Sequence, residues 1–175
     1  FFHINHNIPD SAGIVVETPS GTVVHTGDWK FDFHPVGEPP ADLQKIAAIG
    51  REGVICLMGD STNANRPGHQ VSEKEIGETL DRIIEKAPGR LIIGTFASLL
   101  SRVRQIIEIA DFYGKKVAIE GFSMKTNVEI AREIGFIQTK KETFIPIEAT
   151  DKYDDNKIVI VCTGAQGESK AALMR

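Results

Sequence analysis

A chain of 175 residues is long enough for one full hydrophobic core or two partial ones. Hydrophobic residues make up 41% and charged residues 25%, the composition of an ordinary soluble globular protein. The net charge of −4 excludes a protein that holds nucleic acid by bulk positive charge, so any RNA contact must be local. No apolar stretch of membrane-spanning length and no secretory signal is found, so no membrane partner is expected.

The first 70 residues predict an antiparallel sheet edge. Three strands are predicted, over residues 1–5, 13–18 and 22–25. A loop and a helix are then predicted, over residues 31–40 and 41–50. The apolar run 53–58 predicts a buried strand that places Asp60 in the loop at its carboxyl end, where α/β proteins carry functional groups.

From Ser72 onward, predicted helices and strands alternate. Ser72 and Glu75 form a capping box that begins the first helix of this half. Helices are predicted over 72–86, 98–113 and 126–134 and from 167 onward. Their apolar stripes are expected to face inward and include Ile83, Ile134 and the set Leu99, Val103, Ile106, Ile107 and Ala110. Strands are predicted over 91–93, which is expected to be buried, and over 117–119, 144–147 and 158–161. This alternation predicts a mostly parallel α/β sheet covered by helices, with a domain boundary near residue 70.

The two cysteines, Cys56 and Cys162, both lie in apolar runs that predict buried strands. They are therefore expected to be small core residues without a disulfide, as in proteins of a reducing cytoplasm.

A histidine and an aspartate flank the predicted hairpin. His6 precedes its first arm and Asp28 follows its second, so the two side chains can meet at one edge of the sheet. Imidazole nitrogen and carboxylate oxygen are ligands that zinc takes. Taken alone, a histidine near a proline turn and an aspartate after glycine are more typical of turns. His25, within a predicted strand, is expected to be packed and to donate one hydrogen bond.

Three longer segments, in this order and spacing, resemble the metallo-β-lactamase/β-CASP nucleases and most closely the ribonuclease J family. They are HNIPDS (6–11), GTVVHTGDWK (21–30) and GDSTNA (59–64). Shorter matches are AS (97–98), GFSM (121–124) and TGAQGE (163–168). The family's His-x-His-x-Asp-His motif does not occur here. In the family it lies upstream of residue 1, and two further histidines lie beyond residue 175, so the chain is expected to be the middle of a longer enzyme.

The resemblance implies a fold and an activity. Residues 1–70 would be the C-proximal part of a metallo-β-lactamase αββα sandwich, and residues 71–175 most of a β-CASP domain. The activity implied is hydrolysis of RNA phosphodiesters by a zinc-dependent ribonuclease, acting as a 5′–3′ exonuclease, an endonuclease or both. A cytoplasmic homo-oligomer, dimer or tetramer, is implied for the full-length enzyme. The 175 residues alone are expected to be inactive, because catalytic zinc needs about three protein ligands per ion.

Residue roles also follow from the resemblance. His6 and Asp28 would be metal ligands, with Asp28 bridging two Zn²⁺ ions that activate a hydroxide for attack on phosphorus. Asp60 would be a catalytic acidic residue that orients a histidine near the leaving group. An RNA phosphate would be held at a helix N-terminus by these residues: Thr163, Gly164, Ala165, Gln166 and Gly167, together with Ser98.

Two other functions remain open at this stage. One is a small-molecule hydrolase of the same metal fold, such as a lactonase or thioesterase, because a fold does not fix a substrate. The other is a non-catalytic RNA-binding module, since His6 and Asp28 cannot complete a two-metal site. The metal content of the full-length protein would discriminate between them.

Overall fold

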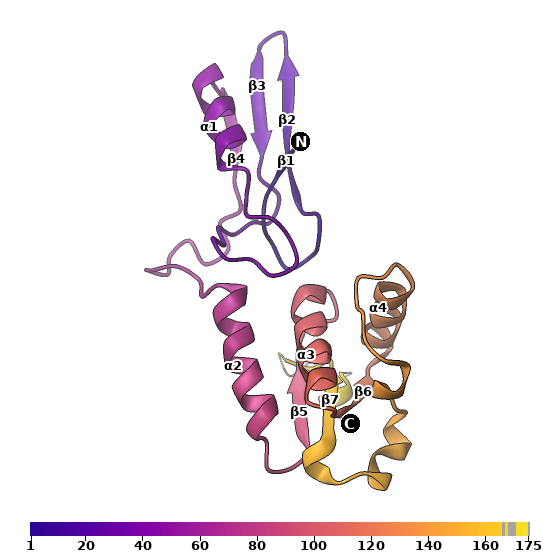
Figure 1. Ribbon diagram of the computed structural model, residues 1–175. Coiled ribbons are helices and arrows are strands. Elements are labelled where there is room, and N and C mark those ends of the chain that lie inside the picture. The colour runs from indigo at the N-terminus through magenta and orange to yellow at the C-terminus, as the bar shows by residue number, and fades with distance from the viewer. Residues whose placement is uncertain (166, 168–170, 175) are drawn as a thin grey trace. The chain divides into compact units, whose positions relative to one another are not determined.

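The computed structural model describes residues 1–165, 167 and 171–174. The chain forms two compact units, Phe1–Glu75 and Ile76–Arg175 (Figure 1). Within the described residues, no helix combines the length and the apolar character that crossing a membrane requires.

The first unit contains a four-stranded sheet in the order β1-β2-β3-β4. Its strands are β1 Phe2–His3, β2 Ala12–Thr18, β3 Gly21–His25 and β4 Cys56–Met58. The antiparallel pairing predicted for the first three strands is confirmed. Strand β4, however, pairs in parallel with β3. The chain between them forms helix α1, Leu43–Glu52, and such a crossover returns the chain in the same direction.

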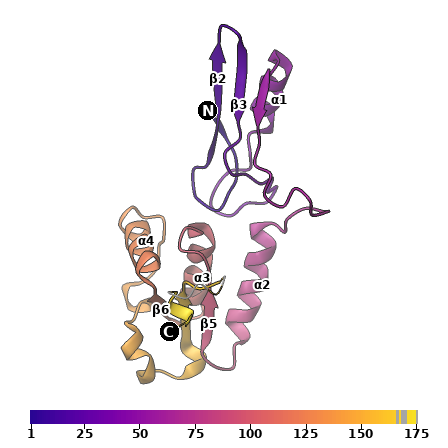
Figure 2. The ribbon, with the colours of Figure 1, turned by 180° about the vertical axis from the view of Figure 1, so that it is seen from behind.

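Helix α1 packs on this sheet, as the view from behind shows (Figure 2). Its Ile46 and Ile49 pack against a buried cluster of Phe2, Ile4 and Val24. The helix begins two residues later than predicted, because the Asp42 carboxylate accepts a hydrogen bond from the amide of Lys45 (2.9 Å) and caps it.

The prediction that 53–58 is a buried strand is wrong. The side chain of Leu57 is exposed (66%), as are those of Ile55 and Met58. Strand β4 is an edge strand, so it has a neighbour on one side only. Cys56 is exposed for the same reason, whereas Cys162 is buried as expected, and both thiols are free.

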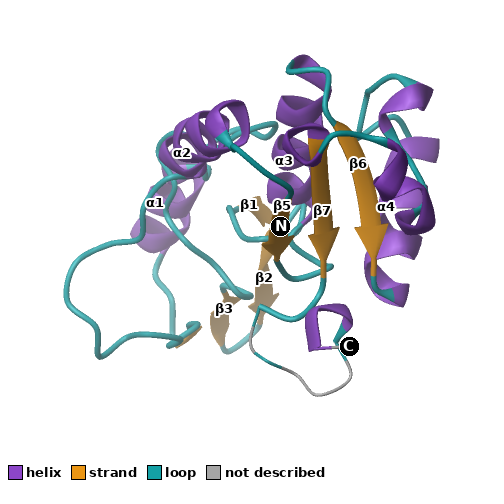
Figure 3. Ribbon diagram, turned by 90° about the horizontal axis from the view of Figure 1, so that it is seen from below, coloured by secondary structure: helices purple, strands orange, loops and turns teal. Residues whose placement is uncertain are grey.

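The second unit is built on a three-stranded parallel sheet in the order β5-β7-β6 (Figure 3). Its strands are β5 Leu91–Gly94, β6 Lys116–Glu120 and β7 Ile158–Cys162. The helices of this half are α2 Glu73–Lys86, α3 Leu100–Phe112 and α4 Phe122–Glu133. The predicted parallel α/β architecture is therefore confirmed. The serine half of the predicted capping box is present, since the hydroxyl of Ser72 accepts a hydrogen bond from the amide of Glu75 (3.3 Å).

Both faces of the central strand β7 are buried. On one face, Val159 and Val161 pack with the α3 stripe, which is the one predicted: Leu99, Val103, Ile106, Ile107 and Ala110 are all buried. On the other face, Ile158 and Ile160 pack against Ile145 and Ile147. The uninterrupted burial of β7 explains its continuous apolar sequence.

The predicted strand over 144–147 does not form. Phe144 makes a single parallel bridge to Val117, and 3₁₀ turns stand on either side, at Lys141–Thr143 and Ile147–Lys152. Pro146 has no N–H to donate to a ladder, which limits pairing in this segment. A third 3₁₀ turn, Asp155–Lys157, leads into β7.

Several apolar side chains predicted to face inward are exposed instead: Ile83, Ile92 and Ile134. Ile92 lies on β5, an edge strand, and Ile134 follows the last residue of α4. Helix α4 itself starts four residues earlier than predicted. The helix predicted from residue 167 falls largely on residues outside those described, after which a 3₁₀ turn spans Ala172–Met174.

The packing predicts which isoleucines carry the stability of the second unit. Ile107→Ala should lower the free energy of unfolding by about 2–5 kcal/mol, because the fully buried side chain leaves a cavity. Ile130→Ala, at an exposed position of α4, should change it by less than about 0.5 kcal/mol. Urea denaturation followed by circular dichroism measures both values, and equal effects would contradict the described core.

Candidate functional site

His6 and Asp28 come together in the structure. Asn5 and Lys30 form an antiparallel bridge in which the Lys30 amide donates to the Asn5 carbonyl (2.9 Å). This bridge sets the loop after β1 beside the loop after β3. The His6 Nε2 atom lies 3.9 Å from Asp28 Oδ2, and the two side chains are 28% and 81% exposed.

The separation of this pair is near that of two ligands on one metal ion. Zinc bonds nitrogen and oxygen at about 2.0–2.2 Å in tetrahedral geometry, which places two ligand atoms about 3.4 Å apart, so a small rotation of the exposed Asp28 side chain would bring both atoms to a shared ion. Among the described residues, no group of three or more His, Cys, Asp or Glu side chains is gathered where it could hold an ion. His6 and Asp28 therefore fit as two members of a ligand set rather than as a complete one.

Asp60 lies in the loop after β4 and is held by backbone hydrogen bonds. Its Oδ1 accepts from the amide of Thr62 (2.8 Å), and its Oδ2 accepts from the amide of Trp29 (3.4 Å). Its own amide donates to the hydroxyl of Thr26 (3.1 Å). The hydrogen bonds from Thr62, with smaller contributions from the Trp29 amide and from His6, hold the pKa of Asp60 below its ordinary value.

His25 has a role that the sequence did not predict. Its side chain is exposed, and its Nδ1 accepts a hydrogen bond from the amide of Gly27 (2.9 Å) instead of donating one from a packed position. Gly27 has a φ of 66°, a conformation that favours glycine, so the contact stabilises a tight turn. This turn positions Asp28.

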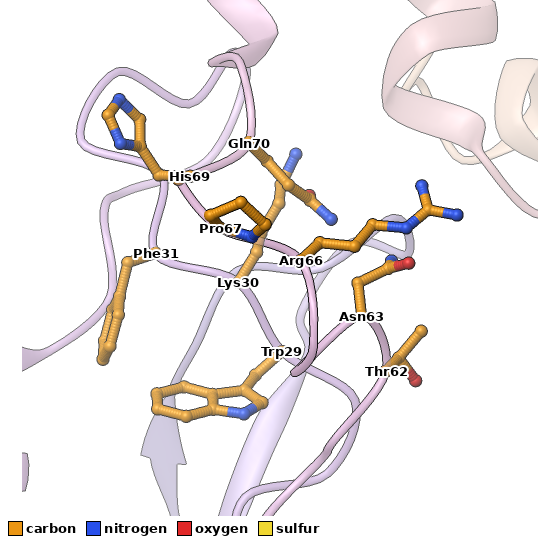
Figure 4. Close-up of a pocket in the computed structure, with 10 residues that line it drawn as sticks. Trp29, Lys30, Phe31, Thr62, Asn63, Arg66, Pro67, His69 and Gln70 are labelled. Atoms are coloured by element: carbon orange, nitrogen blue, oxygen red, sulfur yellow. The ribbon is translucent and has the colours of Figure 1, made fainter.

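A pocket of about 430 Å³ is lined by residues that are near Asp28 and Asp60 in the sequence, among them Trp29 and Thr62 (Figure 4). Trp29 and Phe31 form one part of its wall, with ring centroids 4.5 Å apart at 76°. Trp29 packs against the Phe2 cluster and also lines this pocket. Sequence reasoning missed the pocket because the residues near 70 were interpreted only as a domain boundary.

The candidate phosphate loop follows β7. Parallel strands end at the same edge of a sheet, so Thr163 after β7 and Ser98 after β5 lie at one edge, and Ser98 is exposed. The amide of Thr163 donates to the Glu120 carbonyl (3.3 Å), and that of Gly167 donates to the Gly164 carbonyl (3.0 Å). These two amides are therefore engaged within the protein.

Gly164 is the constrained residue of this loop. Its φ is 127°, and a Cβ atom there would lie 2.7 Å from the Cβ of Leu173. Ala165 forms a turn, whereas Gln166 lies outside the described residues. A pocket of about 510 Å³ opens at the same edge, lined in part by Thr163, Glu120 and Lys125. The Lys125 ammonium lies 2.7 Å from Glu120 Oε1, so its charge is largely compensated.

The hydrogen bonds of Asp60 predict its titration. In the folded protein the pKa of Asp60 should lie below 3.8, the ordinary value for an aspartate. Thr62→Ala removes the hydroxyl but keeps the backbone amide, so it should move this pKa part of the way back toward 3.8. Because the folded protein favours the charged form, the stability that these hydrogen bonds contribute is present above pH 3.8 and is lost as pH falls through the lowered pKa. Carbon-13 NMR of the Asp60 carboxyl measures the pKa, and Ser61→Ala is the neighbouring control. An Asp60 pKa above 3.8 would contradict the described contacts.

Comparison with known proteins places the chain in a family. The model of "Ribonuclease J, beta-CASP domain" matches residues 88–175. Ribonuclease J 1 of Streptococcus pyogenes serotype M3 is 47% identical over 175 residues, 100% of this chain and 31% of that protein. Ribonuclease J of Thermus thermophilus is 44% identical over 174 residues, 99% of this chain and 30% of that protein.

Ribonuclease J of Mycobacterium tuberculosis is 43% identical over 175 residues, covering 100% of this chain and 31% of that protein. A solved structure of a protein of unknown function from Enterococcus faecalis V583 is similar to this chain, with a TM-score of 0.63 at 16% sequence identity. The match covers 91% of this chain and 40% of that one, and it shows a likeness of fold alone. The chain spans about a third of the length of these curated relatives or less. On the family match and on these identities, the chain belongs to the ribonuclease J family of β-CASP proteins.

Proposed function

We propose that the full-length protein containing this chain is an RNA-degrading or RNA-processing hydrolase that cleaves phosphodiester bonds. The observation that carries the proposal is the pairing of His6 Nε2 with Asp28 Oδ2 at 3.9 Å, in a chain whose whole length matches proteins named Ribonuclease J. Because the chain covers 31% or less of these relatives, the activity is proposed for the longer protein.

The proposed cofactor is a pair of Zn²⁺ ions. When bound, zinc acts as a Lewis acid and lowers the pKa of coordinated water to near neutrality. His6 would hold one ion, and the Asp28 carboxylate would be shared by both. Residues 1–70 would then belong to a metallo-β-lactamase domain, and residues 71–175 to the β-CASP domain.

Asp60 is proposed to position a proton donor and not to bind metal. Hydrogen bonds from Thr62 favour its charged form, so it remains a carboxylate near neutral pH. A carboxylate fixed in this way can accept a hydrogen bond from a histidine and hold its ring toward the leaving oxygen.

RNA is the proposed partner, in a cytoplasmic homo-oligomer that acts from a 5′ end, internally or in both ways. The loop 163–167, with Ser98, is proposed to lie against an RNA phosphate near a 5′ end. Its support is its position where parallel strands end, which is where α/β proteins bind ligands. Since the Thr163 and Gly167 amides are already engaged, the contact would use side chains or the remaining amides of the loop.

Losing Asp28 should damage the enzyme differently from losing Asp60. Asp28→Asn should remove both metal and activity, because a bridging ligand is lost, whereas Asp60→Asn should retain metal and lower kcat by about 10- to 100-fold. Elemental analysis and RNA cleavage assays on the full-length protein measure the two effects. Asp10→Asn is the matched control, since Asp10 lies in the His6 loop with a φ of 60° that asparagine also tolerates. Equal metal depletion in the Asp28 and Asp60 variants would contradict the assigned roles.

The phosphate loop generates a separate prediction. Gly164→Val should displace the loop, because any Cβ there would collide with Leu173. The preference for 5′-monophosphorylated over 5′-hydroxyl RNA should fall about tenfold with the metals retained, the effect of losing about one charge-assisted contact. Gly89→Ala, where a Cβ meets open space, is the control. An unchanged 5′-end preference in a folded Gly164→Val variant would refute the phosphate role.

A further inference from the structure

The pocket beside Trp29, named here the Trp29 pocket, has a composition suited to a nucleotide. Its lining residues are Trp29, Lys30, Phe31, Thr62, Asn63, Arg66, Pro67, Gly68, His69 and Gln70. Among the residues that the structure describes, no carboxylate lines it. Its volume of about 430 Å³ falls within the range of small-ligand sites.

The charge available in the Trp29 pocket comes from Arg66. The ammonium of Lys30 is already paired with Glu73 (2.8 Å) and lies 3.7 Å from Asp32. The Arg66 side chain, by contrast, makes no hydrogen bond or ion pair within residues 1–165, 167 and 171–174. A guanidinium with all its donors available is a ready partner for a phosphate.

The aromatic wall offers stacking surface. Phe31 meets Trp29 edge to face and is 45% exposed, so part of its ring is open to a ligand. Figure 4 shows Thr62 and Asn63 on one flank of the pocket and Phe31 on the other. A planar ring held in this pocket would therefore have hydroxyl and amide groups on the side opposite Phe31. Unpaired bases combine a stacking face with a hydrogen-bonding edge.

We infer that the Trp29 pocket binds one unpaired base of single-stranded RNA in the corner between the nearly perpendicular rings of Trp29 and Phe31, stacked on one ring and in edge contact with the other, with Arg66 on a flanking phosphate. The inference deepens the proposed function and rests on it. Trp29 directly follows Asp28, and its amide donates to Asp60 Oδ2 (3.4 Å). A base held here would therefore fix the RNA strand relative to the candidate metal ligand and to the positioning carboxylate.

The decisive measurement is equilibrium binding of the full-length protein to a short single-stranded RNA in EDTA, which prevents metal-dependent cleavage. One abasic nucleotide is moved through the RNA position by position. Loss of the base should weaken binding about tenfold at one position or two adjacent positions, the effect of one lost stacking contact. Equal affinity for all abasic RNAs and the intact RNA would overturn the proposal.

Variants assign that position to the pocket. Phe31→Ala should weaken binding of the intact RNA by a similar factor. It should cause no further loss of affinity for the sensitive abasic RNA, because the same contact is already missing there. Phe33→Ala is the matched control, since Phe33 is 68% exposed on the same segment but does not line the pocket. Trp29→Phe, which retains a ring against the Phe2 cluster, should weaken binding less than Phe31→Ala. If the affinity losses from Phe31→Ala and from the abasic RNA simply add, the base binds elsewhere and the inference is refuted.

Salt dependence tests the phosphate contact. Arg66→Ala should reduce the slope of log K against log salt by about one, while Arg51→Ala, an exposed arginine at the end of α1, should leave it unchanged. An unchanged slope for Arg66→Ala would show that Arg66 does not contact an RNA phosphate. Cleavage by the wild-type protein is assayed separately with zinc, so failure to cleave would refute the proposed function while a position-specific abasic effect would still support the base pocket.

Discussion

The buried side chain of Asn5 is the constraint on which the candidate metal site depends. Asn5 is fully buried, and its amide group makes two hydrogen bonds, donating to the Pro39 carbonyl and accepting from the Ala41 amide, both at 2.9 Å. Its backbone carbonyl accepts from the Lys30 amide. One residue thus joins β1 to the chain before α1 and to the loop after β3. His6 follows it directly and Asp28 lies two residues before Lys30, so a satisfied polar core sets the backbone positions from which the two side chains project.

A buried charge cluster extends this constraint to the start of α2. The Lys30 side chain is 10% exposed, and its partners Asp32 and Glu73 are 1% and 5% exposed. Asp32 also accepts hydrogen bonds from the amides of His34 and Glu73. Buried ion pairs add little net stability, because desolvation offsets much of their attraction, but leaving one partner unpaired is costly. The cluster therefore fixes the path of residues 30–34, including the Phe31 wall of the Trp29 pocket.

Local patterns predicted the elements better than they predicted burial. The α3 stripe, the Ser72 capping box and the parallel order around β7 follow from periodicity and capping, which are local properties. Exposure of β4 and of Ile92 depends on which strands lie at sheet edges, and edge position is decided by long-range pairing. The meeting of His6 and Asp28 was expected from hairpin geometry. The pocket residues Phe31 and Arg66 were missed because they come from segments that show no periodicity.

The difference between Asp28 and Asp60 follows from how many hydrogen bonds each already makes. Each carboxylate oxygen of Asp60 accepts a backbone N–H, and its own amide is bound to Thr26, so its orientation is fixed. Asp28 is 81% exposed, and the polar side-chain atom that lies near its carboxylate, within the described part of the chain, is His6 Nε2 at 3.9 Å. A metal ion must replace the solvent around its ligands, and replacing water costs less than breaking hydrogen bonds to backbone amides. Asp28 is thus suited to bind an ion and Asp60 to orient a neighbouring group, although both lie in loops at strand ends of the same sheet.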